Sequence, residues 1–154
     1  MSRQIGDVPT RTFNPGDVIF KEGDDAKSEA FLIHLGKVEI RKNLGGEEKL
    51  LRVQSKGELL GEFALFRNIP RSATAIAADA VTLMVIPANR LDAMVRTNPG
   101  LAMAIIKDLV SRMLAAEDRA REAEERTRKA EERAREAEDR ARKAEGGAGA
   151  AGAS

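Results

Sequence analysis

A nearly identical seven-residue repeat occupies residues 116–143, and it limits what the rest of the chain can fold into. Residues 116–143 read AEDRARE, AEERTRK, AEERARE and AEDRARK. A heptad with Ala at two positions and mostly charged residues elsewhere forms a helix without a broad apolar face. Residues 117–154 hold 21 of the 51 charged side chains, which leaves 30 for the first 116 residues. A hydrophobic core must therefore come from those first residues, and 154 residues allow one such domain plus a helical appendage.

The heptad register begins upstream of the repeat and leaves two structures open. Ile106 occupies position a and Leu109 position d, and the seam continues through Met113 into alanines. In a parallel coiled coil every g-to-e′ contact pairs opposite charges. The e positions are Glu117, Glu124, Glu131 and Glu138, and the g positions are Arg119, Arg126, Arg133 and Arg140.

The alternative is a single solvated helix. A seam of alanines buries little apolar surface, so it contributes little free energy to association. The e-position glutamates can also form ion pairs within one helix at spacing i, i+4. Their partners there are Arg121, Arg128, Arg135 and Arg142. The sequence therefore predicts either a homodimer through the C-terminal helix or an isolated helix, and it does not decide between them.

Residues 10–87 are typical of short strands separated by turns. Turn sequences occur at regular intervals, for example NPGD at residues 14–17 and NLGG at residues 43–46. Apolar and polar residues alternate between the turns, as in residues 37–41, and residues 81–86 form an apolar run ended by Pro87. This pattern predicts an all-β sandwich or barrel.

After Pro87 the apolar period becomes helical. Asn98 followed by Pro99 predicts the start of a second, long helix, because Asn caps helices and Pro suits the first helical position. We therefore expect a domain at residues 1–115, a charged heptad helix at residues 116–145 and a flexible Gly/Ala tail at residues 146–154.

Composition excludes several classes of site. The chain has no Cys and one His, His34, so neither a metal site nor a thiolate nucleophile is expected. A net charge of +1 gives no general field for nucleic acid or anionic membranes. No signal peptide and no membrane-spanning stretch is evident in the sequence, so we expect a soluble, cytoplasmic protein.

One segment between two predicted strands carries the ingredients of a small anion site. Gly61 lets the backbone approach a ligand closely, residues 63–66 can form a helical turn with free N–H groups, and Arg71 supplies a planar fork. Ser72 and the N–H of Ala73 can add hydrogen bonds. These groups together predict a phosphate ligand.

Glu62 lies inside the same segment and needs a different partner. A carboxylate is a poor phosphate ligand but accepts hydrogen bonds from a hydroxyl. We therefore expect Glu62 to bind a sugar hydroxyl, which indicates a phosphate beside a ribose.

Residues 61–75, GEFALFRNIPRSATA, resemble the phosphate-binding cassette of the cyclic nucleotide-binding domain family, found in bacterial cAMP receptor proteins, protein kinase A regulatory subunits and nucleotide-gated channels. Residues 13–20 resemble the family's opening strand pair, and residues 36–40 its mid-barrel strand. The likeness covers about residues 10–115 in family order. It implies a mainly β fold with α-helices, namely an eight-stranded jelly-roll β-barrel with flanking helices, here extended by the long charged helix.

Carried over residue by residue, the resemblance implies specific roles in the cassette. Arg71 pairs with the cyclic phosphate, and Glu62 accepts from the ribose 2′-hydroxyl. Gly61 opens the segment. The remaining phosphate contacts come from the hydroxyl of Ser72 and from the backbone amides of Phe63, Ala64 and Ala73.

The resemblance also bears on the base. In the family a Thr after the phosphate arginine often favours cGMP, whereas this chain has Ser72, so cAMP is the expected ligand and cGMP the second candidate. The family's C-terminal helix presents one side chain over the purine. Its usual offset falls at Arg112, whose guanidinium can stack on adenine. The alternative is that Arg112 is a solvated charge at heptad position g.

The sequence thus predicts a stand-alone cyclic nucleotide sensor that signals through its C-terminal helix. It predicts no enzyme, because the cassette offers binding groups but neither a general base nor a metal-bound water for hydrolysis. Charged heptads stand where the family's transcription factors carry a winged helix-turn-helix, so no direct DNA binding is expected and the downstream protein partner is unknown. The alternative function is a ligand-blind scaffold whose coiled coil mediates oligomerisation.

Overall fold

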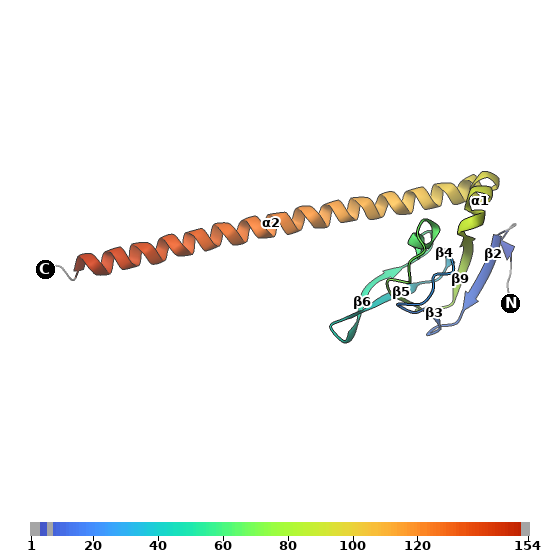
Figure 1. Ribbon diagram of the computed structural model, residues 1–154, viewed down its shortest axis with the longest axis horizontal. Helices are drawn as coiled ribbons and strands as arrows, with labels where there is room; N and C mark the ends of the chain where they lie inside the picture. The colour runs from blue at the N-terminus through green and yellow to red at the C-terminus, as the bar shows by residue number, and fades with distance from the viewer. Residues whose placement is uncertain (1–3, 6–7, 152–154) are drawn as a thin grey trace. The chain divides into compact units, whose positions relative to one another are not determined.

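Two antiparallel β-sheets form the β-rich part of the chain in a computed structural model, which describes residues 4–5 and 8–151 (Figure 1). The first sheet has the strand order β1 (Gln4–Ile5), β2 (Val8–Phe13), β9 (Val81–Pro87), β4 (Glu29–Leu35), β7 (Leu59–Leu60). The second has the order β3 (Val18–Phe20), β8 (Thr74–Ala77), β5 (Val38–Leu44), β6 (Glu47–Gln54). The predicted mainly β fold of short strands is confirmed.

Strand β4 shows how the layers pack. Its side chains alternate between the two faces of the sheet, as a pleated strand requires. Ala30 and Leu32 lie in a cluster with residues of the helices, whereas Phe31 and Ile33 lie in a second cluster with Val38 of the other sheet. All are buried. The first sheet is therefore covered on one face by helices and on the other by the second sheet.

The predicted eight-stranded closed barrel is not confirmed. The described residues give nine strands, and they lie in two separate sheets of five and four strands. The edge strands β1 and β7 have two residues each, and strand β3 has three. These three strands and the longer strand β6 each pair with one neighbour only, so hydrogen bonding does not continue from one sheet into the other. The apolar side chains between the sheets hold them together instead.

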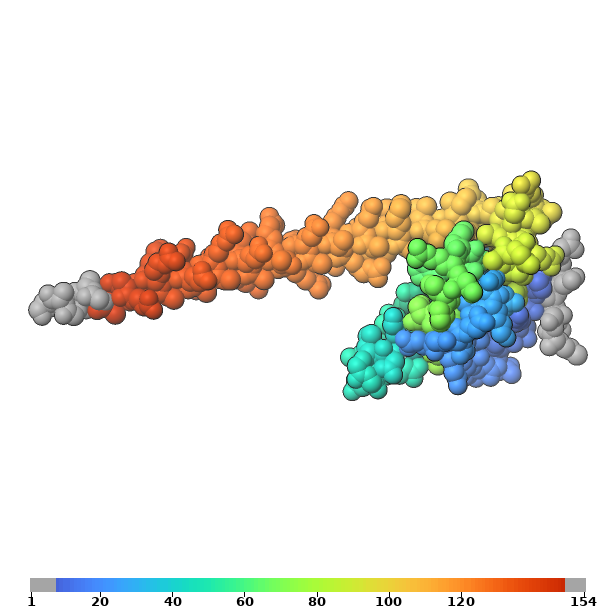
Figure 2. Space-filling model, in the orientation of Figure 1, coloured from blue at the N-terminus to red at the C-terminus, as the bar shows by residue number. Residues whose placement is uncertain are grey.

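Strands β5 and β6 form the hairpin that the sequence predicts. Gly45 and Gly46 occupy its turn with φ of 67° and 90°, a conformation that two-residue hairpin turns require and L-residues avoid. Figure 2 shows this hairpin, in teal, projecting beyond the rest of the sandwich. Its outer strand β6 is an edge, and Leu50 and Leu51 on it are exposed.

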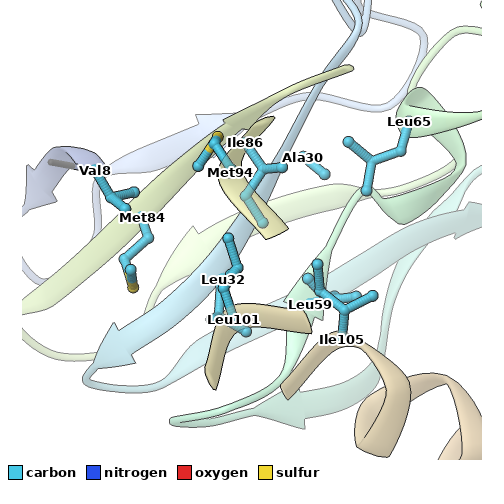
Figure 3. Packing of buried hydrophobic residues seen from close by; sticks show 10 residues of the cluster. All are labelled: Val8, Ala30, Leu32, Leu59, Leu65, Met84, Ile86, Met94, Leu101 and Ile105. Atoms are coloured by element: carbon cyan, nitrogen blue, oxygen red, sulfur yellow. The ribbon is translucent and has the colours of Figure 1, made fainter. Parts of the chain in front are cut away.

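Three helical segments follow β9: the 3₁₀ turn η2 (Ala88–Arg90), α1 (Leu91–Thr97) and α2 (Pro99–Ala151). Asn98 caps α2 as predicted, since its Oδ1 accepts from the N–H of Leu101 at 3.1 Å. Leu101 and Ile105 are buried in the cluster under the first sheet, turned toward Leu32 and Leu59 (Figure 3). The beginning of α2 is thereby part of the core.

The chain divides into two compact units between Leu109 and Val110, and the domain ranges expected from the sequence stay a prediction. In the second unit the side chains of the heptads are exposed to solvent. The helix includes residues 146–151, the first part of the predicted flexible tail, and residues 152–154 lie outside the described part. Within the described residues, no helix has an apolar stretch long enough to cross a membrane.

Ion pairs along the distal helix differ from those expected. They join Glu122 to Arg126, Glu125 to Lys129 and Glu136 to Arg140, all at spacing i, i+4. The predicted pairs between e-position glutamates and the arginines four residues later do not form in the described helix. Each charged side chain has several oppositely charged neighbours one helical turn away, and ion pairs with them have similar energies. Heptad position alone therefore does not determine which pair forms.

Candidate functional site

One cavity in the first unit is lined by every predicted site residue except Arg112. These residues are Gly61, Glu62, Phe63, Ala64, Arg71, Ser72 and Ala73. Phe20, Ala26 and Ile40 also line the cavity, as do Arg52 and Gln54 of strand β6. The segment singled out in the sequence therefore closes one side of a cavity whose other side is built by the second sheet and the loop before β4.

The turn η1 (Glu62–Leu65) forms where the sequence predicts a helical turn. The N–H of Ala64 donates to the carbonyl of Gly61 at 3.1 Å, and the N–H of Arg67 donates to the carbonyl of Phe63 at 2.8 Å. Ala64 and Leu65 are buried, so one side of the turn is anchored in the core. Phe63 is exposed, and it lines the cavity.

Arg71 is the most unusual side chain of the cavity, because it is an arginine that is only 7% exposed. Its Nη2 donates to the carbonyl of Ala26 at 3.0 Å. Its Nε and Nη1 are buried without a hydrogen-bond partner among the described residues. Buried donors of a charged group are costly when unpaired, so a built site for an acceptor is the simplest physical account.

The backbone of Arg71 is fixed on both sides by the loop before β4. Its N–H donates to the carbonyl of Asp24 at 2.8 Å, and its carbonyl accepts from the N–H of Gly23 at 2.8 Å. The guanidinium lies over aromatic rings, with Cζ 4.4 Å from the ring centroid of Phe20 and 5.5 Å from that of Phe31. These contacts hold the side chain at the cavity wall.

The electrostatics of Arg71 follow from its burial. Desolvation lowers the pKa of the Arg71 guanidinium, while the carboxylates of Glu29, Asp24 and Asp25 act in the opposite direction. No carboxylate among the described residues forms an ion pair with Arg71, since Glu29 binds Arg11 instead at 3.1 Å. An arginine remains charged under ordinary conditions, so the cavity contains a cation that an anion can neutralise.

Gly61 is required by two separate constraints. Its φ of +66° lies in the left-handed region, where an L side chain is strained. A Cβ at this position would overlap Nη1 of Arg71, and it would lie 3.2 Å from Cζ. Glycine thus leaves room for the guanidinium itself, in addition to the backbone approach for which the sequence singled it out.

The other predicted residues differ in exposure. Glu62 and Ala73 are half-buried and Ser72 is exposed, all at the cavity wall. Arg112 is half-buried and lies in the second unit, so its expected contact with a purine stays a prediction. Within the described residues no group of three or more potential metal ligands comes together.

Sequence reasoning missed Phe20 and Ala26, which contact the guanidinium from a strand and a loop. The sequence gives little indication that Phe20 belongs to the site, because aromatic residues at strand ends are common in hydrophobic cores. Ala26 contributes a backbone carbonyl, for which no side-chain pattern exists. The Phe20 contact depends on the tertiary pairing of β3 with β8, which joins Phe20 to Ala75, and the Ala26 contact depends on the backbone hydrogen bonds between Arg71 and the loop before β4.

Comparison with known proteins agrees with this geometry. The sequence model of the cyclic nucleotide-binding domain matches residues 10–98, which is more than half of the chain. The chain therefore belongs to the cyclic nucleotide-binding domain family, and the resemblance carried by the cassette is confirmed.

Two curated relatives illustrate the extent of the match. A cAMP-dependent protein kinase regulatory subunit of Mycosarcoma maydis is 39% identical over 70 residues, covering 46% of this chain and 13% of the relative. The cyclic AMP receptor protein of Thermus thermophilus is 32% identical over 108 residues, covering 70% of this chain and 50% of the relative. The chain thus spans at most about half the length of these relatives.

Solved structures share the fold. The Thermus thermophilus catabolite activator protein matches with a TM-score of 0.58 and 31% identity over 70% of this chain and 51% of that one. The EAL enzyme Bd1971 matches in a cAMP-bound form (TM-score 0.51, 29% identity, 71% of this chain and 29% of that one). Its cGMP-bound form also matches, with a TM-score of 0.51 and 29% identity, over 68% of this chain and 27% of that one.

Proposed function

We propose that this chain is a cyclic nucleotide sensor that binds cAMP in the cavity beside Arg71. The observation that carries the proposal is the buried guanidinium with two unpartnered donors at the cavity wall. The N–H groups of a guanidinium form charge-assisted hydrogen bonds with phosphate oxygens, and the family whose members bind cyclic nucleotides supports this assignment. The proposed activity is binding, without a catalytic step.

The remaining contacts follow from the arrangement of the cassette. Glu62 lies at the cavity wall, where its carboxylate can accept from the ribose 2′-hydroxyl. The hydroxyl of Ser72 and the backbone amides of Phe63, Ala64 and Ala73 complete the hydrogen bonds to the phosphate, and the Ala64 N–H exchanges its bond to the Gly61 carbonyl for one to the ligand. These groups are supported by their common position around one cavity.

We assign the base preference to cAMP, with cGMP as the weaker ligand. Ser72 follows the phosphate arginine, where a Thr in the family often favours cGMP. The related enzyme Bd1971 has been solved in both cAMP-bound and cGMP-bound forms, so this fold accommodates either purine. Arg112 supplies the purine stack in this proposal, through the planar face of its guanidinium.

The signal leaves through α2. Leu65, in the turn that carries the cassette, shares a core cluster with Leu101 and Ile105 of α2 (Figure 3). A ligand that repositions the turn therefore changes the packing of the helix, provided that it binds one arrangement more tightly than the other. A tenfold preference corresponds to about 1.4 kcal/mol. Hydrogen exchange along residues 99–115 tests this step, and protection unchanged by cAMP contradicts it.

A homodimer through α2 completes the proposal. Ile106, Leu109 and Met113 are exposed, although they form the large apolar part of the heptad seam. The same exposure supports the second candidate function, an oligomerising scaffold whose sandwich binds no ligand. Light scattering with and without cAMP separates a ligand-dependent assembly from a constitutive one. An unknown protein receives the signal in the first case.

The test of the main proposal is calorimetric titration of refolded, nucleotide-free chain with cAMP and then cGMP. We expect micromolar or tighter cAMP binding. Arg71→Ala removes the charge-assisted hydrogen bonds to the phosphate and weakens binding by at least about 10- to 100-fold. Arg67→Ala is the matched control, because Arg67 lies in the same segment but is exposed and does not line the cavity.

Three outcomes decide between the candidates. Loss of binding in Arg71→Ala alone supports the sensor. Equal binding by wild type and Arg71→Ala contradicts the assigned role of Arg71. No heat and no thermal stabilisation with either nucleotide at millimolar concentration favours the scaffold.

A further inference from the structure

The Arg71 guanidinium is held by an aromatic face rather than by a carboxylate. Its Cζ lies 4.4 Å from the ring centroid of Phe20, well inside the range of a cation–π contact. Phe31 is farther away, at 5.5 Å, and its ring also lies 5.5 Å from Cζ of Arg11. Phe20 is therefore the ring that belongs chiefly to Arg71.

The fold places this ring with several constraints. Phe20 ends strand β3 and pairs with Ala75 of β8, four residues after Arg71. Its ring stacks on that of Phe31, with centroids 6.3 Å apart and planes inclined by 20°. Because Phe31 is buried in the core between the sheets, the ring of Phe20 has a fixed neighbour behind it. The guanidinium and the ring also line the same cavity.

This arrangement has a consequence for ligand binding. A carboxylate partner would compete with an anionic ligand for Nε and Nη1, and its displacement would cost free energy. A ring face attracts the cation without occupying any N–H group. With Nη2 on the Ala26 carbonyl and Cζ over the ring of Phe20, the two unpartnered donors remain for the ligand.

We infer that Phe20 is a positioning residue for the nucleotide phosphate: its ring face holds the Arg71 guanidinium at the cavity wall with Nε and Nη1 unoccupied. This inference rests on the proposed function, because it names how the same site is preorganised. Without the ring, Arg71 populates other rotamers, and the apparent affinity falls with the fraction of chains that keep the competent one.

The ordinary explanation of Phe20 is an apolar residue packed on the core between the sheets. Phe20→Leu removes the ring and keeps an apolar side chain, and Phe20→Tyr keeps the ring. A trifluorinated phenylalanine at position 20 keeps the shape and weakens the negative ring face. Phe13→Leu is the matched control, because Phe13 packs on the same cluster and has no cation over its ring among the described contacts.

The experiment is calorimetric titration of each full-length variant with cAMP, together with thermal unfolding without ligand. We expect Phe20→Leu and the trifluorinated variant to bind about 3- to 30-fold more weakly, the range that corresponds to one partly to fully desolvated cation–π contact. Phe20→Tyr and Phe13→Leu bind as wild type does.

Other results overturn the inference in distinguishable ways. If the trifluorinated variant, which keeps the fold even where Phe20→Leu does not, binds like wild type, the ring has no electrostatic role. If Phe20→Tyr loses as much affinity as Phe20→Leu, the site needs the shape of phenylalanine alone. In both cases wild type still binds cAMP, and Arg71→Ala still does not. Absence of binding by wild type refutes the proposed function and this inference together.

Discussion

Ile105 and Ile106 are neighbours in one helix and lie in opposite environments. Ile105 is 8% exposed and packs under the first sheet, whereas Ile106 is 53% exposed. The difference continues on either side: Leu101 is buried toward the sandwich, and Met113 is exposed on the heptad seam. One continuous helix thus has a segment stabilised by tertiary packing and a segment stabilised by local interactions.

The sandwich and the distal helix are ordered by different interactions. In the sandwich, strand pairing and two apolar clusters fix the side chains. In the distal helix, exposed residues with high helix propensity and i, i+4 ion pairs maintain the backbone. The candidate site is built in the first region, and the second region consists of exposed side chains.

The largest effect on stability is expected for truncation of the buried Ile105. Ile105→Ala leaves a cavity in the core and should lower the free energy of unfolding by about 2–5 kcal/mol. Ile106→Ala removes exposed surface and should change it by less than about 0.5 kcal/mol in the monomer, because no core packing is lost. Urea denaturation measures both.

The same pair of variants tests association. Ile106→Ala should weaken a dimer that uses the heptad seam, and light scattering over a concentration series measures this. If Ile106→Ala instead destabilises the monomer as much as Ile105→Ala does, the seam is packed on the sandwich and the contrast within α2 is wrong.

The next effect concerns the site. Gly61→Ala forces an L-residue to φ +66° and places a Cβ against Nη1 of Arg71. We expect a stability loss of about 1–2 kcal/mol from the backbone and a loss of cAMP affinity of at least about 10-fold, since the guanidinium must move. Thermal unfolding and calorimetry give the two values.

Gly57→Ala is the matched control for this prediction. Gly57 has φ +89°, and a Cβ there meets no heavy atom within 4 Å. It should reproduce the backbone strain and leave cAMP affinity unchanged. Equal affinity loss in both variants would assign the effect of Gly61→Ala to strain alone.

Much of this arrangement could be predicted from the sequence, because local chemistry determines it. The Asn98 cap, the Gly45–Gly46 hairpin turn and the helical turn after Gly61 each depend on residues close in sequence. The cassette residues came together for the same reason, as one continuous segment folded around one cavity.

The features that could not be predicted depend on tertiary contacts. The cation–π contact joins Phe20 to Arg71 only because β3 pairs with β8. The division into two separate sheets depends on which strands pair across the fold, and turn signals do not determine that pairing. The heptad pattern predicted the helix correctly but not which of its charges form ion pairs, because several partners have similar energies.

A smaller effect is expected at the junction where α2 begins. Asn98→Ala removes the side-chain acceptor of the Leu101 N–H and should cost about 1 kcal/mol of unfolding free energy. Because Leu101 packs in the core, this cost should appear in the cooperative unfolding of the sandwich. Asn98→Asp, which keeps an acceptor, should restore stability. A cap variant as stable as wild type would show that the helix start is held by core packing alone.

The smallest effect belongs to the distal helix. Glu125→Gln removes the ion pair in which Oε1 of Glu125 lies 2.6 Å from Nζ of Lys129. Both side chains are about half exposed. Such pairs contribute about 0.3–0.5 kcal/mol, so helicity by circular dichroism should fall slightly at low salt and match wild type at high salt, where screening removes the pair. Glu124→Gln is the control, because Glu124 forms none of the ion pairs described along this helix. In a dimer Glu124 faces a g-position arginine of the second chain, so a larger effect of Glu124→Gln than of Glu125→Gln would place the distal helix in a coiled coil rather than alone in solvent.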